Sequence, residues 1–255
     1  NFDDQYGKKI KMICDKNNIT NFTYGFEEEC DWRIIDINRS QNFTEVTIKN
    51  KQKKHNFRCK LIADYEIENL LAAIVLANKN GLAIKSILKN IKNIKQSEGR
   101  LKKIFLKKNI VSIYIDYAHT PDALKKSLKA LRIVLKPLAR LLLVFGCGGD
   151  RDKGKRKMMG KIAAKFADKV FITDDNPRYE NASYIRSEIA TYCKKSENIA
   201  GRKKAIDKAI SIMRKDDILL IAGKGHEKGQ EIKGNVIIFD DEFVAKKIFD
   251  KRFSL

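Results

Sequence analysis

Four short segments of the chain are dense in charged residues, glycine or both, and these residue types could do chemistry. They span residues 116–120, 146–154, 174–178 and 223–227. Each segment directly follows a short apolar run that is typical of a buried strand. The carboxyl ends of parallel strands meet at one edge of a sheet, so we expect the four segments to line one crevice there.

Two arginines and one glutamate in these segments suit an amino acid as ligand. Arg151 and Arg178 each carry a planar guanidinium, which can bind a carboxylate through two hydrogen bonds. Glu227 can accept an ammonium group, Pro177 fixes the turn before Arg178, and Gly223 allows close approach of the backbone. We therefore expect a zwitterion to bind in the crevice. A surface ion pair of Arg151 with a neighbouring aspartate is the alternative for that residue.

The glycine-rich segment 146–154 nearly matches a phosphate-binding loop. The spacing G-x-x-x-x-G-K is present at 149–155, but Arg156 stands where such a loop needs Ser or Thr to hold magnesium. Asp150 and Asp152 would also repel a phosphate. We therefore do not expect a nucleoside triphosphate to bind at this segment.

Asp116 and His119 are candidates for contacts with a nucleotide. An acidic side chain at the end of a strand can bind a ribose hydroxyl, as Asp116 could. His119 could act as a general base or donate to a phosphate, and a purely structural hydrogen bond is an equally open interpretation.

The elements that position these segments change character near residue 100. Before it, alternating apolar residues predict short strands, and helical spacing over 68–88 predicts two helices. After it, short apolar strands alternate with helices, which predicts an α/β, Rossmann-like domain with a mostly parallel sheet covered on both faces. We therefore divide the chain into domains 1–100 and 101–255. The expected strands of the second domain are 110–115, 141–145, 170–173 and 218–222, and the expected helices are 121–135, 157–167, 182–193 and 203–213.

Composition indicates a folded protein that lies outside the membrane in a reducing compartment. Apolar residues make up 43% of the 255 residues, which suffices for one large or two ordinary cores. No run approaches the roughly 18 uncharged apolar residues of a membrane span. The five cysteines are odd in number and scattered, which argues against both a disulfide framework and a zinc site. We therefore expect a cytoplasmic location and no metal ligands in this chain.

The formal net charge of +21 raises the possibility of nucleic-acid binding. However, 40 of the 53 basic residues are lysines, which accompany abundant Ile and Asn as in products of AT-rich genomes. The lysines are spread along the chain and are not interleaved with aromatic residues, as a single-strand groove requires. We therefore expect no specific nucleic-acid partner.

The chemistry-bearing segments together resemble the Mur ligases. The similar stretches are 116–124, 145–156, 173–178 and 222–227 with Gln230. Residues 1–4 with Gly7 resemble a segment late in the family's central ATPase domain, 69–72 resemble its following helix, and 99–100 resemble the hinge into the C-terminal domain. Members that add meso-diaminopimelate are the most similar. The resemblance implies the end of a central ATP-binding domain at 1–100, followed by the C-terminal domain that binds the incoming amino acid at 101–255.

What the resemblance implies is an ATP- and Mg²⁺-dependent amide ligase of peptidoglycan precursor synthesis. The substrates would be UDP-N-acetylmuramoyl-L-alanyl-D-glutamate, which ATP phosphorylates on its D-glutamate carboxylate, and meso-diaminopimelate, whose amino group attacks the acyl phosphate. We expect a monomer with no membrane partner. By the resemblance, Arg100 would contact the transferred phosphate as a catalytic residue together with His119, and ATP would meet Asn1, Asp116 and His119. The diaminopimelate would be held by Arg151, Asp175, Asn176, Pro177, Arg178, Gly223 and Glu227.

Arg178 favours diaminopimelate over lysine. Lysine-adding Mur ligases differ in the Asp-Asn-Pro-Arg segment, and lysine lacks the distal carboxylate that a guanidinium would bind. A buried Arg178 left without a partner would cost about 2 to 5 kcal/mol. A lysine-adding ligase, or another Mur-type enzyme such as one similar to folylpolyglutamate synthase, is the alternative.

Several departures from the family indicate a truncated chain. No G-x-x-x-x-G-K-[ST] motif is present, and by the resemblance the phosphate loop and the uridine-nucleotide domain would lie upstream of Asn1. Leu101 and Lys102 stand where relatives usually carry Met-Glu, and Glu66 replaces an expected Asn.

We predict that residues 1–255 alone neither hydrolyse ATP nor form the amide, because the phosphate-binding groups are missing. Purified chain supplied with ATP, Mg²⁺ and both substrates should release no phosphate and no tripeptide product above background. Ligation by this chain alone would contradict the prediction.

Overall fold

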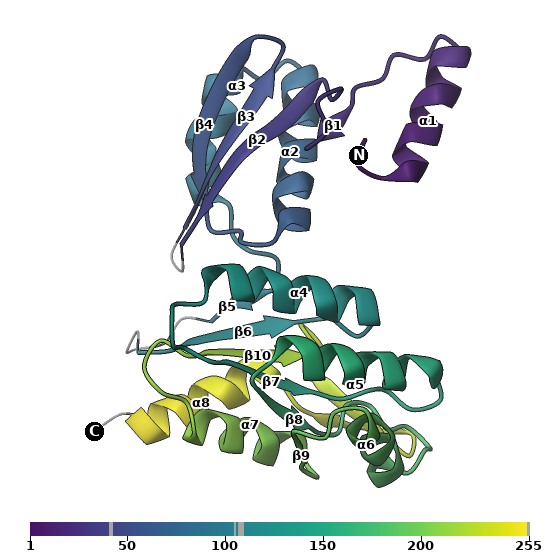
Figure 1. Ribbon diagram of the computed structural model, residues 1–255, viewed down its shortest axis with the longest axis vertical. Helices are drawn as coiled ribbons and strands as arrows, with labels where there is room; N and C mark the ends of the chain where they lie inside the picture. The colour runs from purple at the N-terminus through teal and green to yellow at the C-terminus, as the bar shows by residue number, and fades with distance from the viewer. Residues whose placement is uncertain (41–42, 105, 107–109, 254–255) are drawn as a thin grey trace. The chain divides into compact units, whose positions relative to one another are not determined.

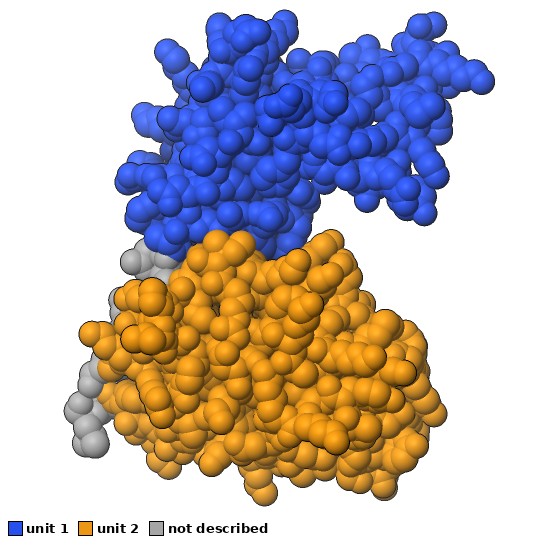
Figure 2. Space-filling view, viewed as in Figure 1, with its two compact units in different colours: residues 1–96 blue, residues 97–255 orange. Residues whose placement is uncertain are grey.

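The chain forms two compact units, residues 1–96 and 97–255, shown in separate colours in Figure 2. The structure, a computed structural model, describes residues 1–40, 43–104, 106 and 110–253. The boundary between the units falls slightly before the position that the sequence suggested, near residue 100. Each unit has its own apolar core and is described by itself.

Unit 1 is a four-stranded sheet with helices, in the strand order β1-β2-β3-β4. Strands β2, β3 and β4 are antiparallel neighbours, and their inward residues alternate with exposed ones, as a half-buried sheet requires. Helix α2 packs Leu71 and Ile74 into the same core as Val46 and Ile48. The elements are α1 (Gln5–Lys16), β1 (Tyr24–Gly25), β2 (Trp32–Arg39), β3 (Thr44–Asn50), β4 (Lys53–Cys59), α2 (Asp64–Lys79), α3 (Ile84–Asn90) and the 3₁₀ turn η1 (Ile91–Asn93).

Unit 2 is a six-stranded sheet in the order β5-β6-β10-β7-β8-β9 (Figure 1). Every pair from β6 to β9 is parallel, and only β5 runs antiparallel to its neighbour. The predicted mostly parallel sheet is therefore confirmed. The elements are β5 (Lys102–Lys103), β6 (Ser112–Asp116), α4 (Pro121–Val134), β7 (Leu141–Phe145), α5 (Gly154–Phe166), β8 (Lys169–Ile172), α6 (Ala182–Thr191), β9 (Ser196–Asn198), α7 (Arg202–Ser211), β10 (Ile218–Ala222), β11 (Gly229–Ile232), β12 (Asn235–Ile238) and α8 (Asp241–Phe253).

The central strands of unit 2 are buried along their whole length, since helices cover both faces of the sheet. Strands β6, β7 and β10 have no exposed residue. Alternate residues such as Ile113, Val144 and Ile221 pack against Ile206 and Phe249 of helices α7 and α8. Figure 1 shows α4 and α5 on the opposite face. Continuous apolar runs such as 141–145 are what such two-sided burial requires.

Two features of unit 2 differ from the sequence-based expectation. Helix α5 begins at Gly154, earlier than the expected 157. Asp152, which precedes the N-cap residue Lys153, accepts a hydrogen bond from the Gly154 backbone N–H at 2.8 Å and so satisfies one N–H of the first helical turn. We also predicted no strand or helix after residue 222, where the structure has the β11–β12 hairpin and helix α8.

The segment that opens unit 2 is fastened to the carboxyl edge of the sheet. Gly99 has φ +64°, and a Cβ there would lie 2.2 Å from the backbone nitrogen of His226. Its carbonyl accepts a hydrogen bond from the Tyr117 N–H at 2.7 Å. The N–H of Leu101 donates to Asp116 Oδ1 at 3.2 Å. Only glycine fits here, because the backbones of two loops approach it closely.

We predict that Gly99→Ala destabilises unit 2 much more than Gly201→Ala does. Both residues have positive φ, which costs an alanine about 1 to 2 kcal/mol, but nothing lies closer than 3.9 Å to a Cβ at Gly201. The clash at Gly99 should add about 1 to 3 kcal/mol. Native-state hydrogen exchange of the β10 amides would measure this, since the single Trp, Trp32, lies in unit 1. Equal effects of the two substitutions would contradict the steric argument.

Candidate active site

The four chemistry-bearing segments lie at one edge of the unit 2 sheet. Strands β6, β10, β7 and β8 are consecutive and parallel neighbours, so the loops that follow them leave the sheet at the same edge. Backbone bonds connect these loops directly. The Gly223 N–H donates to the Asp116 carbonyl at 3.0 Å, and the Gly149 N–H donates to the Asn176 carbonyl at 2.9 Å.

The loops after β8 and β10 meet in a cluster of three polar side chains. Asn176 Nδ2 donates to Glu227 Oε2 at 3.0 Å. The Lys224 ammonium donates to the same Oε2 at 3.0 Å and to Asn176 Oδ1 at 2.9 Å. The Lys224 side chain is fully buried, whereas that of Glu227 is 33% exposed. The predicted pair Asn176 and Glu227 is therefore brought together, and Lys224 is a member that sequence reasoning missed.

The Glu227 carboxyl is held in its ionised form. Partial burial acts to raise its pKa, but the hydrogen bonds from Lys224 and Asn176 outweigh burial, so the pKa lies below its ordinary value. Oε1 of this carboxylate has no hydrogen-bond partner among the residues that the structure describes. The carboxylate therefore presents one free, negatively charged oxygen at the sheet edge.

Arg178 lies on the loop after β8, and among the described residues one nitrogen of its guanidinium, Nη2, has no hydrogen-bond partner. Its φ is +51°, and its backbone N–H donates to the Glu231 carbonyl at 3.1 Å. Nε pairs with Glu231 Oε2 at 2.9 Å, and Nη1 donates to the Gly149 carbonyl at 2.8 Å. Nη2 makes no hydrogen bond to any described residue. Arg178 can therefore still donate to a ligand carboxylate, in competition with the neighbouring Glu231.

Arg151 is exposed, and no hydrogen bond or ion pair joins it to the other predicted ligands, all of which the structure describes. The alternative of an ion pair with a neighbouring aspartate is not seen among the described residues. Asp150 instead accepts a hydrogen bond from the Tyr179 N–H at 3.0 Å, and Asp152 accepts one from the Gly154 N–H at the start of helix α5. Since Asp152 occupies the helix N-terminus that a phosphate would use, the geometry supports the argument against a nucleotide loop at 149–155.

Asp175 contacts a buried charge network that the sequence did not reveal. Arg202 is buried and pairs with Asp241 through two hydrogen bonds of 2.7 Å. Arg202 Nη2 also donates to the carbonyl of Ala222 at 2.9 Å, and Nη1 lies 3.8 Å from Asp175 Oδ2. A Cβ at Gly223 would lie 2.5 Å from the same Oδ2. The network therefore holds the ends of β8 and β10 together.

The pKa of Arg202 reflects this pairing. Burial alone acts to lower it, but the adjacent Asp241 carboxylate outweighs burial and raises the pKa above its ordinary value. No local pattern distinguishes Arg202 or Asp241 in the sequence, because they lie far apart along the chain and each begins an ordinary-looking helix.

A second cluster surrounds Tyr117 at the same edge of unit 2. The Arg100 guanidinium carbon lies 4.9 Å from the centre of the Tyr117 ring. The rings of His119 and His226 have centroids 4.6 Å and 5.4 Å from that ring. His119 Nδ1 lies 2.9 Å from the Tyr117 carbonyl oxygen. Arg100 and His119 are thus brought together, and Tyr117 is the residue that sequence reasoning did not single out.

Asp116 and Asn1 make internal contacts. Asp116 is 3% exposed, and its oxygens accept hydrogen bonds from Ser127 Oγ and from the Leu101 N–H. Burial raises its pKa, although these bonds oppose the shift. Asn1 lies in unit 1, where its side chain donates to Glu68 at 3.1 Å.

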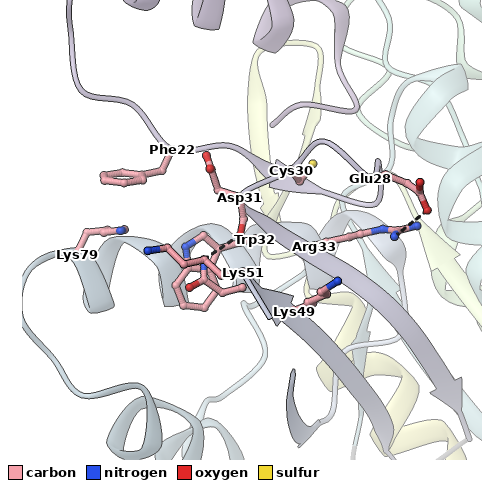
Figure 3. A pocket seen from close by; sticks show the side chains of 10 residues that line it. Phe22, Glu28, Cys30, Asp31, Trp32, Arg33, Lys49, Lys51 and Lys79 are labelled. Carbon is pink, nitrogen blue, oxygen red and sulfur yellow. Dashed lines mark hydrogen bonds and ion pairs between the residues drawn. The ribbon is translucent and has the colours of Figure 1, made fainter. Parts of the chain in front are cut away.

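Two hollows of the surface lie elsewhere. One of about 420 Å³ in unit 1 is lined by residues of β2, β3 and α2 and of the loops beside these strands (Figure 3). They include Trp32, whose buried Nε1 has no partner among the described residues. Another, of about 1070 Å³, lies between α7 and α8 of unit 2. Neither hollow contains a predicted site residue. The candidate site is therefore defined by the hydrogen bonds and ion pairs among its side chains and not by either of these hollows.

Comparison with known proteins identifies the family. Residues 1–77 match the Mur ligase middle domain, and residues 99–225 match the domain described as Mur ligase, glutamate ligase domain. The two matches include every residue of both clusters except His226, Glu227, Glu231 and Asp241. The chain belongs to the Mur ligase family.

Similar proteins carry the name UDP-N-acetylmuramoyl-L-alanyl-D-glutamate–2,6-diaminopimelate ligase. The one from Rickettsia conorii is 38% identical over 240 residues, which cover 93% of this chain and 49% of that protein. The one from Zymomonas mobilis is 44% identical over 219 residues, covering 84% and 45%. A solved structure of such a ligase has 31% identity and a TM-score of 0.70, covering 98% of this chain and 52% of that one. The chain spans about half the length of the relatives it matches.

Two further observations bear on ligands and membranes. Over residues 1–40, 43–104, 106 and 110–253, no three His, Cys, Asp or Glu side chains gather as metal ligands would. In the same ranges, no helix has both the length and the apolar character that crossing a bilayer demands.

We predict that Arg202→Leu lowers the free energy of unfolding of unit 2 by about 3 to 5 kcal/mol, because it leaves the buried Asp241 carboxylate without its partner. The matched control is Arg252→Leu, which breaks the exposed pair with Asp207 and should cost less than about 1 kcal/mol. Hydrogen exchange of the β10 amides again reports on unit 2. A loss at Arg202 no larger than at Arg252 would contradict the assigned role.

Proposed function

We propose that this chain is the amino-acid-binding part of an ATP-dependent ligase that joins meso-diaminopimelate to UDP-N-acetylmuramoyl-L-alanyl-D-glutamate in peptidoglycan precursor synthesis. The single observation that carries the proposal is that two groups with unused hydrogen-bonding capacity, one cationic and one anionic, lie on loops at the same edge of the sheet. Within the described part of the chain, Glu227 has one carboxylate oxygen and Arg178 has its Nη2 without a hydrogen-bond partner, and Asn176 connects their two loops. The names and identities of the most similar proteins support the same substrates.

The chemistry of the ligand fits these groups. Meso-diaminopimelate carries an ammonium and a carboxylate at each end, and one end must stay free so that its amine can attack the acyl phosphate. We assign the other end to Arg178, which would take the carboxylate, and to Glu227, which would take the ammonium. Asp175, Asn176, Pro177 and Gly223 shape the loops around this end, and the exposed Arg151 would approach from the loop after β7.

The second cluster suits the nucleotide and the transferred phosphate. Tyr117 and the two imidazoles offer flat surfaces for a base, and the exposed Arg100 offers a guanidinium for a phosphate. ATP would supply the activation of the D-glutamate carboxylate as an acyl phosphate. We retain His119 in contact with the nucleotide and Asn1 near the adenine. For Asp116 we propose a positioning role, because both its oxygens are already bonded inside unit 2.

The described residues do not supply a magnesium site, so no step of the reaction is assigned to that ion in this chain. The phosphate-binding loop would have to come from the part of the ligase that this chain does not match. We propose that 1–100 ends the ATP-binding domain, that 101–255 binds the amino acid, and that the protein works as a monomer in the cytoplasm without a membrane or nucleic-acid partner.

We predict that Arg178→Ala abolishes the preference for diaminopimelate. Isothermal titration of the chain with meso-diaminopimelate should show a loss of at least about 30-fold in affinity, corresponding to a lost charge pair. Lysine, which lacks the distal carboxylate, should bind the unchanged chain weakly, and the Arg178→Ala substitution should not change its affinity. The control is Arg132→Ala, which removes the ion pair between Arg132 of α4 and Asp168 and should leave binding unchanged.

Two outcomes would overturn the assignment. One is equal or tighter binding of lysine by the unchanged chain, which would favour a lysine-adding ligase. The other is an unaltered affinity for diaminopimelate in the Arg178→Ala variant.

A further inference from the structure

Lys224 is the most unusual charged residue at the candidate site. Its side chain is fully buried although it lies in a loop, and among the described residues its ammonium bonds to the side chains of Asn176 and Glu227. A buried lysine is costly unless its charge is paired, and a neutral side chain of similar length would fill the same space. The lysine therefore has a role that filling space does not explain.

We infer that Lys224 is a positioning residue, which fixes Glu227 in one orientation and keeps it ionised so that this carboxylate can receive the ammonium of the incoming amino acid. This inference rests on the proposed function. In this inference Lys224 does not bind the substrate itself. It sets the orientation and the charge of Glu227, which does.

The orientation follows from which oxygen is used. Both Lys224 and Asn176 donate to Oε2 of Glu227, at 3.0 Å each. Two donors on one oxygen fix the rotation of the carboxylate and leave Oε1 directed away from them. An incoming ammonium on Oε1 would lie nearer to the negative charge than to the Lys224 ammonium, so attraction exceeds repulsion.

Asn176 connects Lys224 to the loop after β8 through a second set of hydrogen bonds. Asn176 Oδ1 accepts from Lys224 and also from the Glu231 backbone N–H at 3.1 Å. Because Asn176 keeps the Glu231 bond when Lys224 is replaced, the loop after β8 should stay in place. The loss should therefore fall mainly on the orientation and charge of Glu227.

The ionisation of Glu227 depends on the groups that face it. Lys224 and His226 from its own loop and Asn176 from the loop after β8 favour the charged form, and the buried Arg202 also interacts with it. Lys224 is the strongest of these favourable influences, while burial opposes them. Without Lys224, the pKa of Glu227 should rise, and the carboxylate should be protonated at a higher pH than in the unchanged chain.

The test compares Lys224→Met with Lys228→Met, an exposed lysine four positions along the same loop region. Titration calorimetry with meso-diaminopimelate at neutral pH should show affinity about 10- to 100-fold weaker for Lys224→Met, the usual effect of losing hydrogen bonds to a charged group. Lys228→Met should bind like the unchanged chain. Binding by Lys224→Met should weaken at a higher pH than binding by the unchanged chain as the solution is acidified, because a carboxyl with a raised pKa is protonated earlier on acidification.

A double-mutant cycle separates positioning from a general loss of structure. In the Glu227→Gln background, Lys224→Met should have little further effect, because Lys224 acts through that carboxylate. Carbon-13 NMR titration of the Glu227 carboxyl, which needs no ligand, should show the higher pKa in Lys224→Met. Amide spectra would establish that each variant is folded.

The outcomes distinguish this inference from the function on which it rests. Diaminopimelate affinity within about twofold of the unchanged chain, an unaltered Glu227 pKa, or equal losses in both backgrounds would overturn the role of Lys224 while leaving the proposed function standing. Failure of the unchanged chain to bind diaminopimelate would count against the proposed function, and the ligand-free titration of Glu227 would then decide the positioning role by itself.

Discussion

The candidate site depends on the hydrogen bonds of the buried Lys224 ammonium, which connect Asn176 of the loop after β8 with Glu227 of the loop after β10. Strands β8 and β10 are not neighbours, since β7 lies between them, so their loops meet only beyond the end of the sheet. Lys224, Asn176 and Glu227 make that meeting specific through three hydrogen bonds of 2.9 to 3.0 Å. Beneath them, the buried Arg202–Asp241 pair connects the ends of the same two strands.

The loop after β10 also connects the two halves of the proposed chemistry. Glu227 belongs to the cluster assigned to the amino acid, whereas His226 stacks near Tyr117 in the cluster assigned to the nucleotide. Gly225 and Gly99 bring this loop into backbone contact with Tyr117 and with the segment that opens unit 2. One loop therefore carries residues of both clusters and, under the proposed function, would set the separation between the bound amine and the phosphate.

Much of this arrangement could be predicted from the sequence because it follows from local patterns. Continuous apolar strands alternating with helices predicted the parallel sheet, and the position of Asp116, Asn176 and Glu227 directly after strands predicted that their loops share an edge. The charged pairs that hold the loops together at this edge of the sheet could not be predicted from such local patterns. Lys224 is one lysine among 40, and the contact of Arg202 with Asp241 joins the starts of two helices that no periodic pattern relates. The Tyr117 stack likewise depends on how the loops after β6 and β10 cross.

The most direct measurement of the central claim is a titration of ¹⁵N-labelled chain with meso-diaminopimelate, followed by amide chemical shifts. The account predicts shifts concentrated in residues 174–178 and 223–227, with smaller ones in 146–154 and none in the α7–α8 hollow or in the unit 1 hollow. Shifts centred on either hollow, or no shifts at concentrations that saturate ligand binding in calorimetry, would contradict it.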